Sequence, residues 1–241
     1  MKSFGAVAFV LWFVFGIDVA LAGDLPLPAT AALSLPPINK AYASSAHWAG
    51  AYLGINGGYG VGSSQWTLGG FWSNVFNTDG FLFGGTVGFN YPVSEVLFGL
   101  EGDVDWSSLN GGTAGCAVNA AGAGAACETK NSFLGTARAR VGYVADRTLF
   151  YVTGGAAFGI VQTGLSPLTT FDSTTRVGWA AGTGLEYAFW GNWSAKAEYL
   201  FVDFGAVSCT TAANCGSATG ASVALTENIA RVGINYIFPI Q

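Results

Sequence analysis

The chain has 241 residues, and its nine Lys and Arg against fourteen Asp and Glu give a formal net charge of −5. An acidic chain without a basic tract is a poor match for a nucleic-acid partner, and we expect none. Apolar residues make up 51% of the sequence, and mean hydropathy is +0.44. Because no segment after the N-terminal region approaches the length of a spanning helix, these side chains must fill a soluble core or face lipid from a closed barrel.

The N-terminus reads as an export signal. Lys2 precedes an apolar run, Phe4 to Ile17, and the small residues Ala20 and Ala22 follow. A basic start, an apolar stretch and a small-x-small site are typical of a secretory signal peptide, and the run is shorter than the roughly 20 apolar residues of a membrane anchor. We predict a signal peptide at residues 1–22, a flexible Pro-rich periplasmic tail at 23–47 and a barrel domain at 48–238.

Eight segments show apolar side chains at every second position, which indicates β-strands. The clearest is Glu95–Trp106, where Val96, Phe98 and Leu100 share one face while Glu101, Asp103 and Asp105 share the other. Each segment exceeds the ~9–11 residues that a tilted strand needs to cross a bilayer. In chain order they are Trp48–Gly60, Gly80–Tyr91, Glu95–Trp106, Phe133–Val144, Leu149–Ile160, Thr175–Tyr187, Trp193–Gly205 and Thr226–Phe238.

The connections alternate between long and short. Residues 61–79, 107–132, 161–174 and 206–225 are long and polar, whereas 92–94, 145–148 and 188–192 are short. Outer-membrane barrels have short periplasmic turns and longer extracellular loops. The sequence therefore predicts an all-β, eight-stranded antiparallel up-and-down transmembrane barrel with four long extracellular loops.

The charged residues argue against a soluble β-sandwich, whose charges would lie on the outer, polar face. Here they share the minority polar face of strands whose other face is apolar, as expected for a barrel with lipid outside. Because eight strands leave an interior that side chains fill, we expect these charges to pair. A selectivity lining and a proton-active carboxylate cluster are the alternatives. The predicted interior charge network comprises Glu101, Asp103, Asp105, Arg138, Arg140, Arg176, Glu186, Lys196, Glu198 and Arg231.

Four cysteines form two close pairs, Cys116 with Cys127 and Cys209 with Cys215, each in a stretch rich in small residues. An exported chain meets an oxidising compartment, so we predict two disulfides in the extracellular loops. Zinc is the rival interpretation, but the spacings are not CxxC and His47 is the only histidine. We predict no catalytic residue, metal or cofactor, because His47 precedes the first strand and would lie at the periplasmic rim.

The sequence resembles the small outer-membrane β-barrel proteins of alphaproteobacteria, often described as outer-membrane immunogenic or porin-family surface proteins. The resemblance implies an eight-stranded barrel in a Gram-negative outer membrane, in contact with lipid and lipopolysaccharide and inserted by the barrel-assembly machinery. Such chains usually finish on an aromatic residue, whereas here Pro239-Ile240-Gln241 follows Phe238, a departure that bears on insertion. The resemblance rests on Trp48–Gly54 with Gly57–Gly60, Arg138–Tyr143, Tyr151–Gly155 and Arg231–Phe238.

The absence of a catalytic constellation favours a structural envelope role with loops displayed at the cell surface. A narrow porin-like diffusion channel for small solutes is one alternative. An adhesin that acts through the extracellular loops on an unknown surface ligand is the other.

Overall fold

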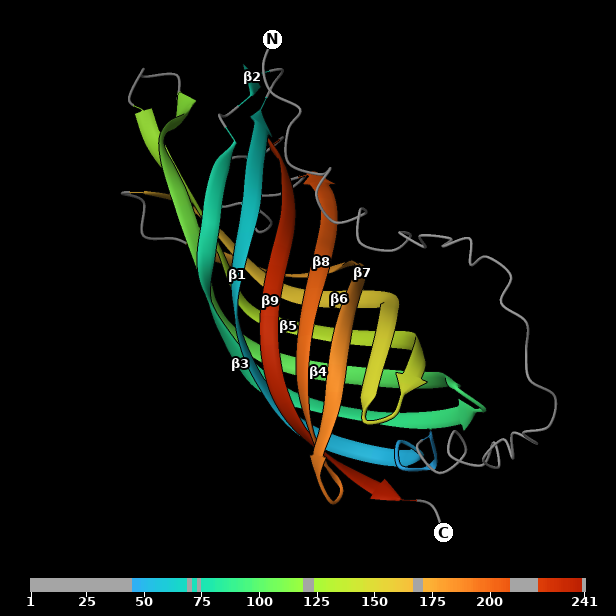
Figure 1. Cartoon of the computed structure of the whole chain (residues 1–241). Coiled ribbons are helices and arrows are strands. Elements are labelled where there is room, and N and C mark those ends of the chain that lie inside the picture. The colour runs from blue at the N-terminus through green and yellow to red at the C-terminus, as the bar shows by residue number, and fades with distance from the viewer. Residues whose placement is uncertain are drawn as a thin grey trace, which may run out of the picture. The chain divides into compact units, whose positions relative to one another are not determined.

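The computed structural model describes residues 45–68, 71–72, 75–118, 124–166, 171–208 and 221–239, which lie in one compact unit, Pro37–Gln241. The predicted signal peptide and residues 23–44 of the predicted tail lie outside this part of the chain. None of the described helical residues forms a segment long and apolar enough to cross a membrane. The strands (Figure 1) are β1 Gly50–Leu68, β2 Phe71–Trp72, β3 Phe76–Val93, β4 Val96–Val118, β5 Gly124–Ala145, β6 Thr148–Ser166, β7 Phe171–Trp190, β8 Trp193–Ser208 and β9 Ala221–Pro239.

The eight long strands close into a ring. Each pairs antiparallel with the next along the chain, and β1 also pairs with β9, where Ala51 lies opposite Phe238. The two residues of β2 pair only with the end of β1, at Thr67 and Leu68. Closure leaves no long strand with an unpaired edge, which a strand crossing lipid requires. The predicted eight-stranded antiparallel barrel is confirmed.

The strands are longer than predicted at one end of the barrel. β4 continues to Val118 and β5 begins at Gly124, so the predicted loop 107–132 is mostly a paired hairpin with irregularities after Trp106 and Thr113. The other three predicted long loops likewise lose residues to the strands that flank them. Beyond the membrane a strand has no lipid-facing side, so its apolar alternation fades while its backbone pairing continues. The predicted strand limits were therefore wrong at these ends.

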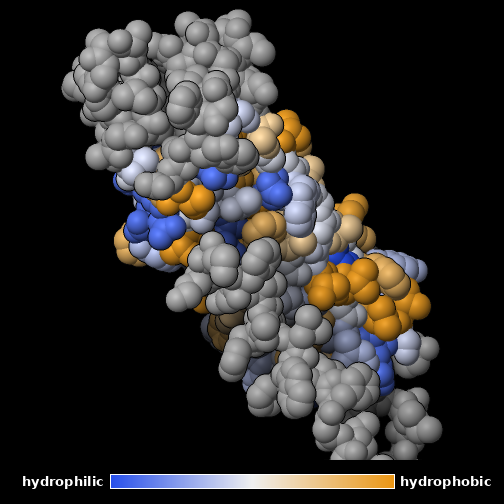
Figure 2. Space-filling model, turned by 90° about the horizontal axis from the view of Figure 1, so that it is seen from above, coloured by the Kyte–Doolittle hydropathy of each residue, from blue (hydrophilic) through white to orange (hydrophobic). Residues whose placement is uncertain are grey.

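The two faces of the strands differ as the alternation predicts. On β4, Leu100 and Trp106 point outward and are 67% and 61% exposed, whereas the inward Glu101 is 3% exposed. Figure 2 shows hydrophobic side chains on the outer wall of the barrel. A soluble sandwich would carry its charges on the outer face, whereas here the wall is apolar and the charged side chains point inward.

Aromatic rings gather near both ends of this apolar wall. At the end with the short turns, Trp193 packs edge-on against Tyr236 with 5.1 Å between ring centroids, and at the other end Tyr59 packs against Phe81 at the same separation. Amphipathic rings at two levels are the girdles that anchor a barrel at the two membrane interfaces. They set the band of the wall that faces lipid.

The interior is stacked in three layers along the barrel axis. The order is clear on β8, where the inward Lys196 and Glu198 are followed by Leu200, Val202 and Phe204, all buried. The charged layer lies between two apolar clusters. The cluster on the short-turn side comprises Trp48, Tyr52, Leu97, Val144, Leu149, Tyr151, Ala188 and Ile237. The cluster on the long-hairpin side comprises Leu82, Leu109, Leu134, Ala157, Val161, Ala180, Leu200, Val202, Phe204, Leu225 and Ile229.

Candidate functional site: the interior charge network

Strand pairing places opposite charges side by side. Glu101 on β4 lies directly opposite Arg138 on β5, and Glu198 on β8 lies opposite Arg231 on β9. Because side chains opposite each other in a ladder share a face, both pairs point into the barrel. All ten predicted network residues are buried.

Arg138 binds carboxylates from two strands. Its Nη2 lies 2.5 Å from Glu101 Oε1 and 2.7 Å from Asp103 Oδ2, both on β4. Its Nη1 donates to Glu198 Oε1 on β8 at 3.1 Å, and its Nε donates to Thr136 Oγ1 at 2.8 Å. A planar guanidinium with several charge-assisted bonds is held in a fixed orientation. Arg138 therefore connects opposite sides of the lumen.

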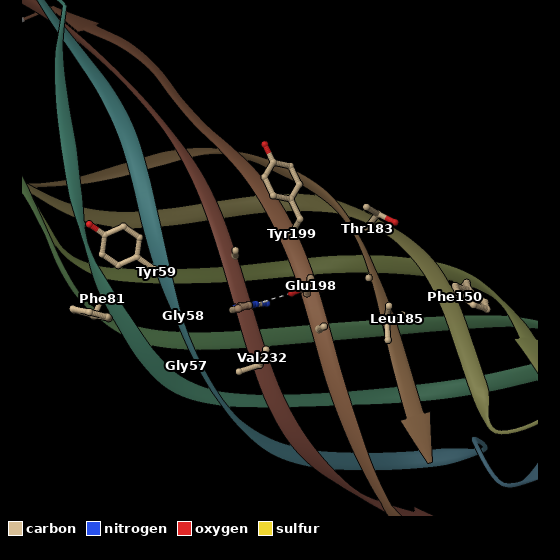
Figure 3. Close-up of a pocket in the computed structure, with 14 residues that line it drawn as sticks. Gly57, Gly58, Tyr59, Phe81, Phe150, Thr183, Leu185, Glu198, Tyr199 and Val232 are labelled. Carbon is tan, nitrogen blue, oxygen red and sulfur yellow. Dashed lines mark hydrogen bonds and ion pairs between the residues drawn. The ribbon is translucent and has the colours of Figure 1, made fainter. Parts of the chain in front are cut away.

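Arg231 mirrors this arrangement from β9. Its Nε donates to Glu198 Oε2 at 2.6 Å, the contact marked at Glu198 in Figure 3. Its Nη1 donates to Asp103 Oδ1 at 2.8 Å and to Asp105 Oδ2 at 2.9 Å. Glu198 thus lies between two guanidinium groups. Together, Arg138 and Arg231 join β4, β5, β8 and β9 through buried ion pairs.

Arg140 and Lys196 form the part of the layer nearest the short turns. Arg140 Nη1 lies 3.4 Å from Glu101 Oε2 and 3.3 Å from Glu186 Oε2. Lys196 Nζ lies 3.1 Å from the same Glu101 oxygen. The Arg140 guanidinium also sits 4.6 Å from the centroid of the Tyr52 ring. Cation–π stacking and ion pairing together hold Arg140 between the charged layer and the apolar cluster.

Inward glycines make room for the large side chains of this region. A Cβ built on Gly88 would lie 2.2 Å from the Tyr52 ring, and one on Gly184 would lie 2.5 Å from the Tyr151 hydroxyl. These distances are far inside van der Waals contact, so only glycine permits each ring to lie over the neighbouring strand, where Gly88 is opposite Tyr52 and Gly184 is opposite Tyr151. The glycine-rich inward face is therefore part of how the lumen is filled.

The structure brings together nine of the ten predicted residues and leaves Arg176 apart. Arg176 lies on β7 on the outer side of the inward Ala180, and its Nη1 donates to the Val223 carbonyl oxygen at 3.4 Å. No carboxylate of the described residues forms an ion pair with it. We use "charge network" below for the nine residues Glu101, Asp103, Asp105, Arg138, Arg140, Glu186, Lys196, Glu198 and Arg231.

The charge network contains one more carboxylate than cations. Its four cations face five carboxylates, and Asp105 is the carboxylate with the fewest partners. Asp105 pairs with Arg231, while its Oδ1 has no hydrogen-bond partner among the described residues. Every other carboxylate of the charge network has its negative charge offset by closer or additional donors.

Several polar contributors were missed from the sequence. Tyr52 donates to Glu101 Oε2 at 2.7 Å and Tyr151 donates to Glu198 Oε1 at 3.0 Å. Asn90 Oδ1 accepts from Arg140 Nη2 at 2.7 Å. Glu227 is fully buried within the apolar cluster on the long-hairpin side, between Leu225 and Ile229 of β9, where it accepts from Asn131 at 2.8 Å. All four lie at inward positions of their strands, so the same alternation could have identified them.

The cysteines and His47 lie away from this layer. Cys116 is on β4 and Cys127 on β5, where Cys127 pairs with Thr113, whereas Cys209 and Cys215 fall outside the described residues. Both disulfides stay predictions, although the first pair lies on strands and not in a loop. The ring of His47 packs edge-on against Trp48, 6.2 Å between centroids, just before β1.

The arrangement is suited to block the lumen. Charges removed from water are stabilised only by close partners, so an ion entering the layer would have to break existing pairs. The apolar clusters on both sides add barriers that a hydrated ion crosses only by losing water. Fold and interior together define a transmembrane β-barrel with a charged layer between two apolar clusters.

The comparisons with known proteins agree with this class. The model of the outer membrane protein beta-barrel domain matches residues 26–238, and the chain belongs to this family. The chain is 32% identical over 236 residues to the 31 kDa outer-membrane immunogenic protein of Brucella melitensis, covering 91% of this chain and 93% of that protein. It is 30% identical over 191 residues to the 25 kDa outer-membrane immunogenic protein of Brucella abortus, covering 79% of each. The predicted resemblance and the outer-membrane location are confirmed.

Two solved structures are similar to this chain at low sequence identity. The outer membrane protease OmpT from Escherichia coli gives a TM-score of 0.51 at 9% identity, covering 78% of this chain and 97% of that one. OprG from Pseudomonas aeruginosa gives a TM-score of 0.48 at 12% identity, covering 80% of this chain and 98% of that one. At 9% identity the likeness to OmpT extends to the fold and not to an activity.

Proposed function

We propose that this protein is a non-enzymatic barrel that supports the outer membrane structurally and displays its outer hairpins at the cell surface, with a lumen closed to ions and solutes. One observation carries the proposal. The chain of contacts from Arg138 through Glu198 and Arg231 to Asp103 crosses the lumen between two apolar clusters. A continuous aqueous path would have to pass all three layers.

The non-enzymatic part of the proposal rests on the state of the carboxylates. A general acid or base must reach a substrate and exchange a proton with it. Glu101, Asp103 and Glu198 are at most 5% exposed, and each is held by ion pairs with guanidinium groups. Groups buried in this way serve packing and strand register better than proton transfer.

Single-channel conductance tests the closed lumen directly. The full chain is refolded, checked for the heat-modifiable migration of a folded barrel, and reconstituted in a planar bilayer, with a known conducting porin prepared in parallel. We expect the porin to conduct and this protein to remain silent at the same protein-to-lipid ratio. Reproducible current steps that scale with salt would overturn the closed lumen and establish the diffusion channel in its place.

Surface display needs a separate test, because a silent barrel could also act as an adhesin. Binding of cells to host or abiotic surfaces is compared for the wild type and a variant whose β4–β5 hairpin is shortened above Leu109 and Asn131, which pair in register. A purely structural role predicts equal binding and a weaker membrane barrier when the whole protein is absent. A loss of binding with an intact barrier would identify an adhesin.

A further inference from the structure

A groove lies on the outer wall over β7, β8, β9 and β1, on the opposite face of the sheet from the charge network. The part nearer the long hairpins has a volume of about 790 Å³, and the part nearer the short turns has a volume of about 750 Å³. The two parts share the lining residues Gly57, Leu185, Ala197 and Val232. The two parts therefore adjoin each other at these residues.

Small outward side chains create the depression. Ala197 on β8, Ala230 on β9 and Gly57 on β1 lie at outward positions, and larger side chains stand around them. Tyr59 and Tyr199 both lie opposite Ala230 in the strand register, and Figure 3 shows them on either side of β9. A Cβ on Gly57 would meet nothing closer than 3.7 Å, so a side chain would fit there without a clash. The floor is therefore low because of residue size and not because of a break in the sheet.

A polar pocket adjoins the outer end of this groove. It has a volume of about 300 Å³, shares Tyr59 with the groove, and is also lined by Asp79 and Asn228. The Tyr59 hydroxyl donates to Asp79, and the Tyr199 hydroxyl donates to Asn228 Oδ1 at 2.6 Å. Its lining includes hydrogen-bond acceptors and one carboxylate but no Lys or Arg. This composition suits an uncharged group that donates hydrogen bonds.

We propose that the groove holds one acyl chain of an outer-leaflet lipid, and that the polar pocket receives an uncharged hydroxyl or amide group of that lipid. This group lies at the neck of the lipid, by which we mean the atoms that join the acyl chain to the headgroup. The groove lies in the apolar band of a barrel located in the outer membrane, where acyl chains are the surrounding solvent. An apolar channel that ends in a polar pocket at the interface matches the division of an amphiphile into chain and neck. The proposal is independent of whether the lumen conducts.

A second copy of the chain is a poorer occupant. A two-fold dimer brings the same surface of both copies together. Two concave grooves facing each other would enclose voids, whose lining atoms lose van der Waals contacts. A flexible chain can instead follow the depression and fill it.

Native mass spectrometry of the full chain released from phosphatidylcholine nanodiscs tests the proposal. The bilayer carries a small fraction of monopalmitoylglycerol, whose single chain has an uncharged hydroxyl-bearing neck, or of palmitate, which has the same chain and an anionic end. Ala197→Leu and Gly57→Leu fill the groove. Ala139→Leu and Gly154→Leu are the matched controls, because both positions are exposed on the outer wall, neither lines the groove, and Gly154 has the same 3.7 Å clearance as Gly57.

We expect the wild type and both controls to retain one monopalmitoylglycerol, and the two filled variants to retain it about tenfold less, a change of roughly 1.4 kcal/mol. Palmitate should be retained less than monopalmitoylglycerol because its carboxylate would face Asp79.

Equal retention in all four variants would overturn the acyl-chain site. Equal retention of the two probes would overturn the neck chemistry. A wild-type dimer that dissociates in Ala197→Leu would show that a second copy occupies the groove. Heat-modifiable migration of each variant confirms that it is folded.

Discussion

Arg138 on β5 forms an ion pair with Glu198 on β8, with 3.1 Å between Nη1 and Oε1. The two strands are not neighbours, since β6 and β7 lie between them in the sheet. The pair therefore crosses the lumen and ties one wall of the barrel to another. Contacts of this kind add a constraint that backbone ladders between adjacent strands cannot supply.

Removing this tie should destabilise the barrel strongly. Arg138→Met keeps an unbranched apolar stem but leaves Glu101, Asp103 and Glu198 without one of their cations. Breaking a buried pair costs about 3–5 kcal/mol, because the remaining charge stays buried without compensation. Urea unfolding of the protein refolded in lipid vesicles measures this loss. Arg147→Met, in the exposed turn between β5 and β6, is the control and should change the free energy of unfolding by less than about 0.5 kcal/mol.

Two neighbouring aspartates should respond differently to the same isosteric change. Asp103→Asn removes a charge that both Arg138 and Arg231 contact, and it should cost about 3–5 kcal/mol. Asp105→Asn removes the excess negative charge of the network and leaves Asp103 and Glu198 paired with Arg231. We expect its cost to be below about 1 kcal/mol, or the barrel to become more stable. Equal losses in the two variants, measured by the same urea titration, would contradict the charge count.

The Tyr52 hydroxyl provides a test of the hydrogen bonds within the layer. Tyr52→Phe keeps the ring beneath Arg140 and removes only the donor to Glu101, which lies 2.7 Å away. A hydrogen bond to a charged group contributes about 1.5–3 kcal/mol, so we expect a loss in that range. Tyr143→Phe removes a comparable bond to Glu95, 2.9 Å long but exposed at the rim, and should have almost no effect. A Tyr52→Phe barrel as stable as the wild type would show that water replaces the lost donor.

The sequence predicts the strands well where lipid and interior impose opposite demands on alternate residues. Phe98 and Leu100 must face lipid, Glu101 and Asp103 must not, and this contrast fixed both the element and its face. The same rule fails for the part of the hairpin outside the membrane. There Gly111 and Gly112 of β4 pair with Thr129 and Glu128 of β5, and neither face of the strands is apolar at these positions. The pairing there extends the ladder of the membrane-spanning part of the same hairpin. Alternation of apolar and polar residues in the sequence does not indicate this extension.

Position along the barrel axis was also beyond the sequence pattern. Arg176 and Glu186 share the inward face of β7, so alternation places both in the network. They are ten residues apart along the strand, with Ala180 of the apolar cluster on the long-hairpin side between them, and the pairing of β7 with β6 and β8 decides which of the two lies level with the other charges. Only the strand register separates a charge that meets the network from one beyond the apolar cluster. For the same reason the apolar clusters themselves were not predicted, since Leu134 and Leu200 look like interruptions of a polar face.

The orientation of the barrel gives the last prediction. The three short turns should face the periplasm and the long hairpins should project outside, as in other outer-membrane barrels. An epitope tag inserted between Asn119 and Ala123, beyond the ends of β4 and β5, should therefore bind antibody on intact cells. The same tag inserted between Asp146 and Arg147, in the turn between β5 and β6, should bind only after the outer membrane is permeabilised. Both tagged proteins must show heat-modifiable migration, which confirms that the tag has not prevented folding. Antibody binding at the short turn on intact cells would reverse the orientation and place the hairpins, including Cys116 and Cys127, in the periplasm.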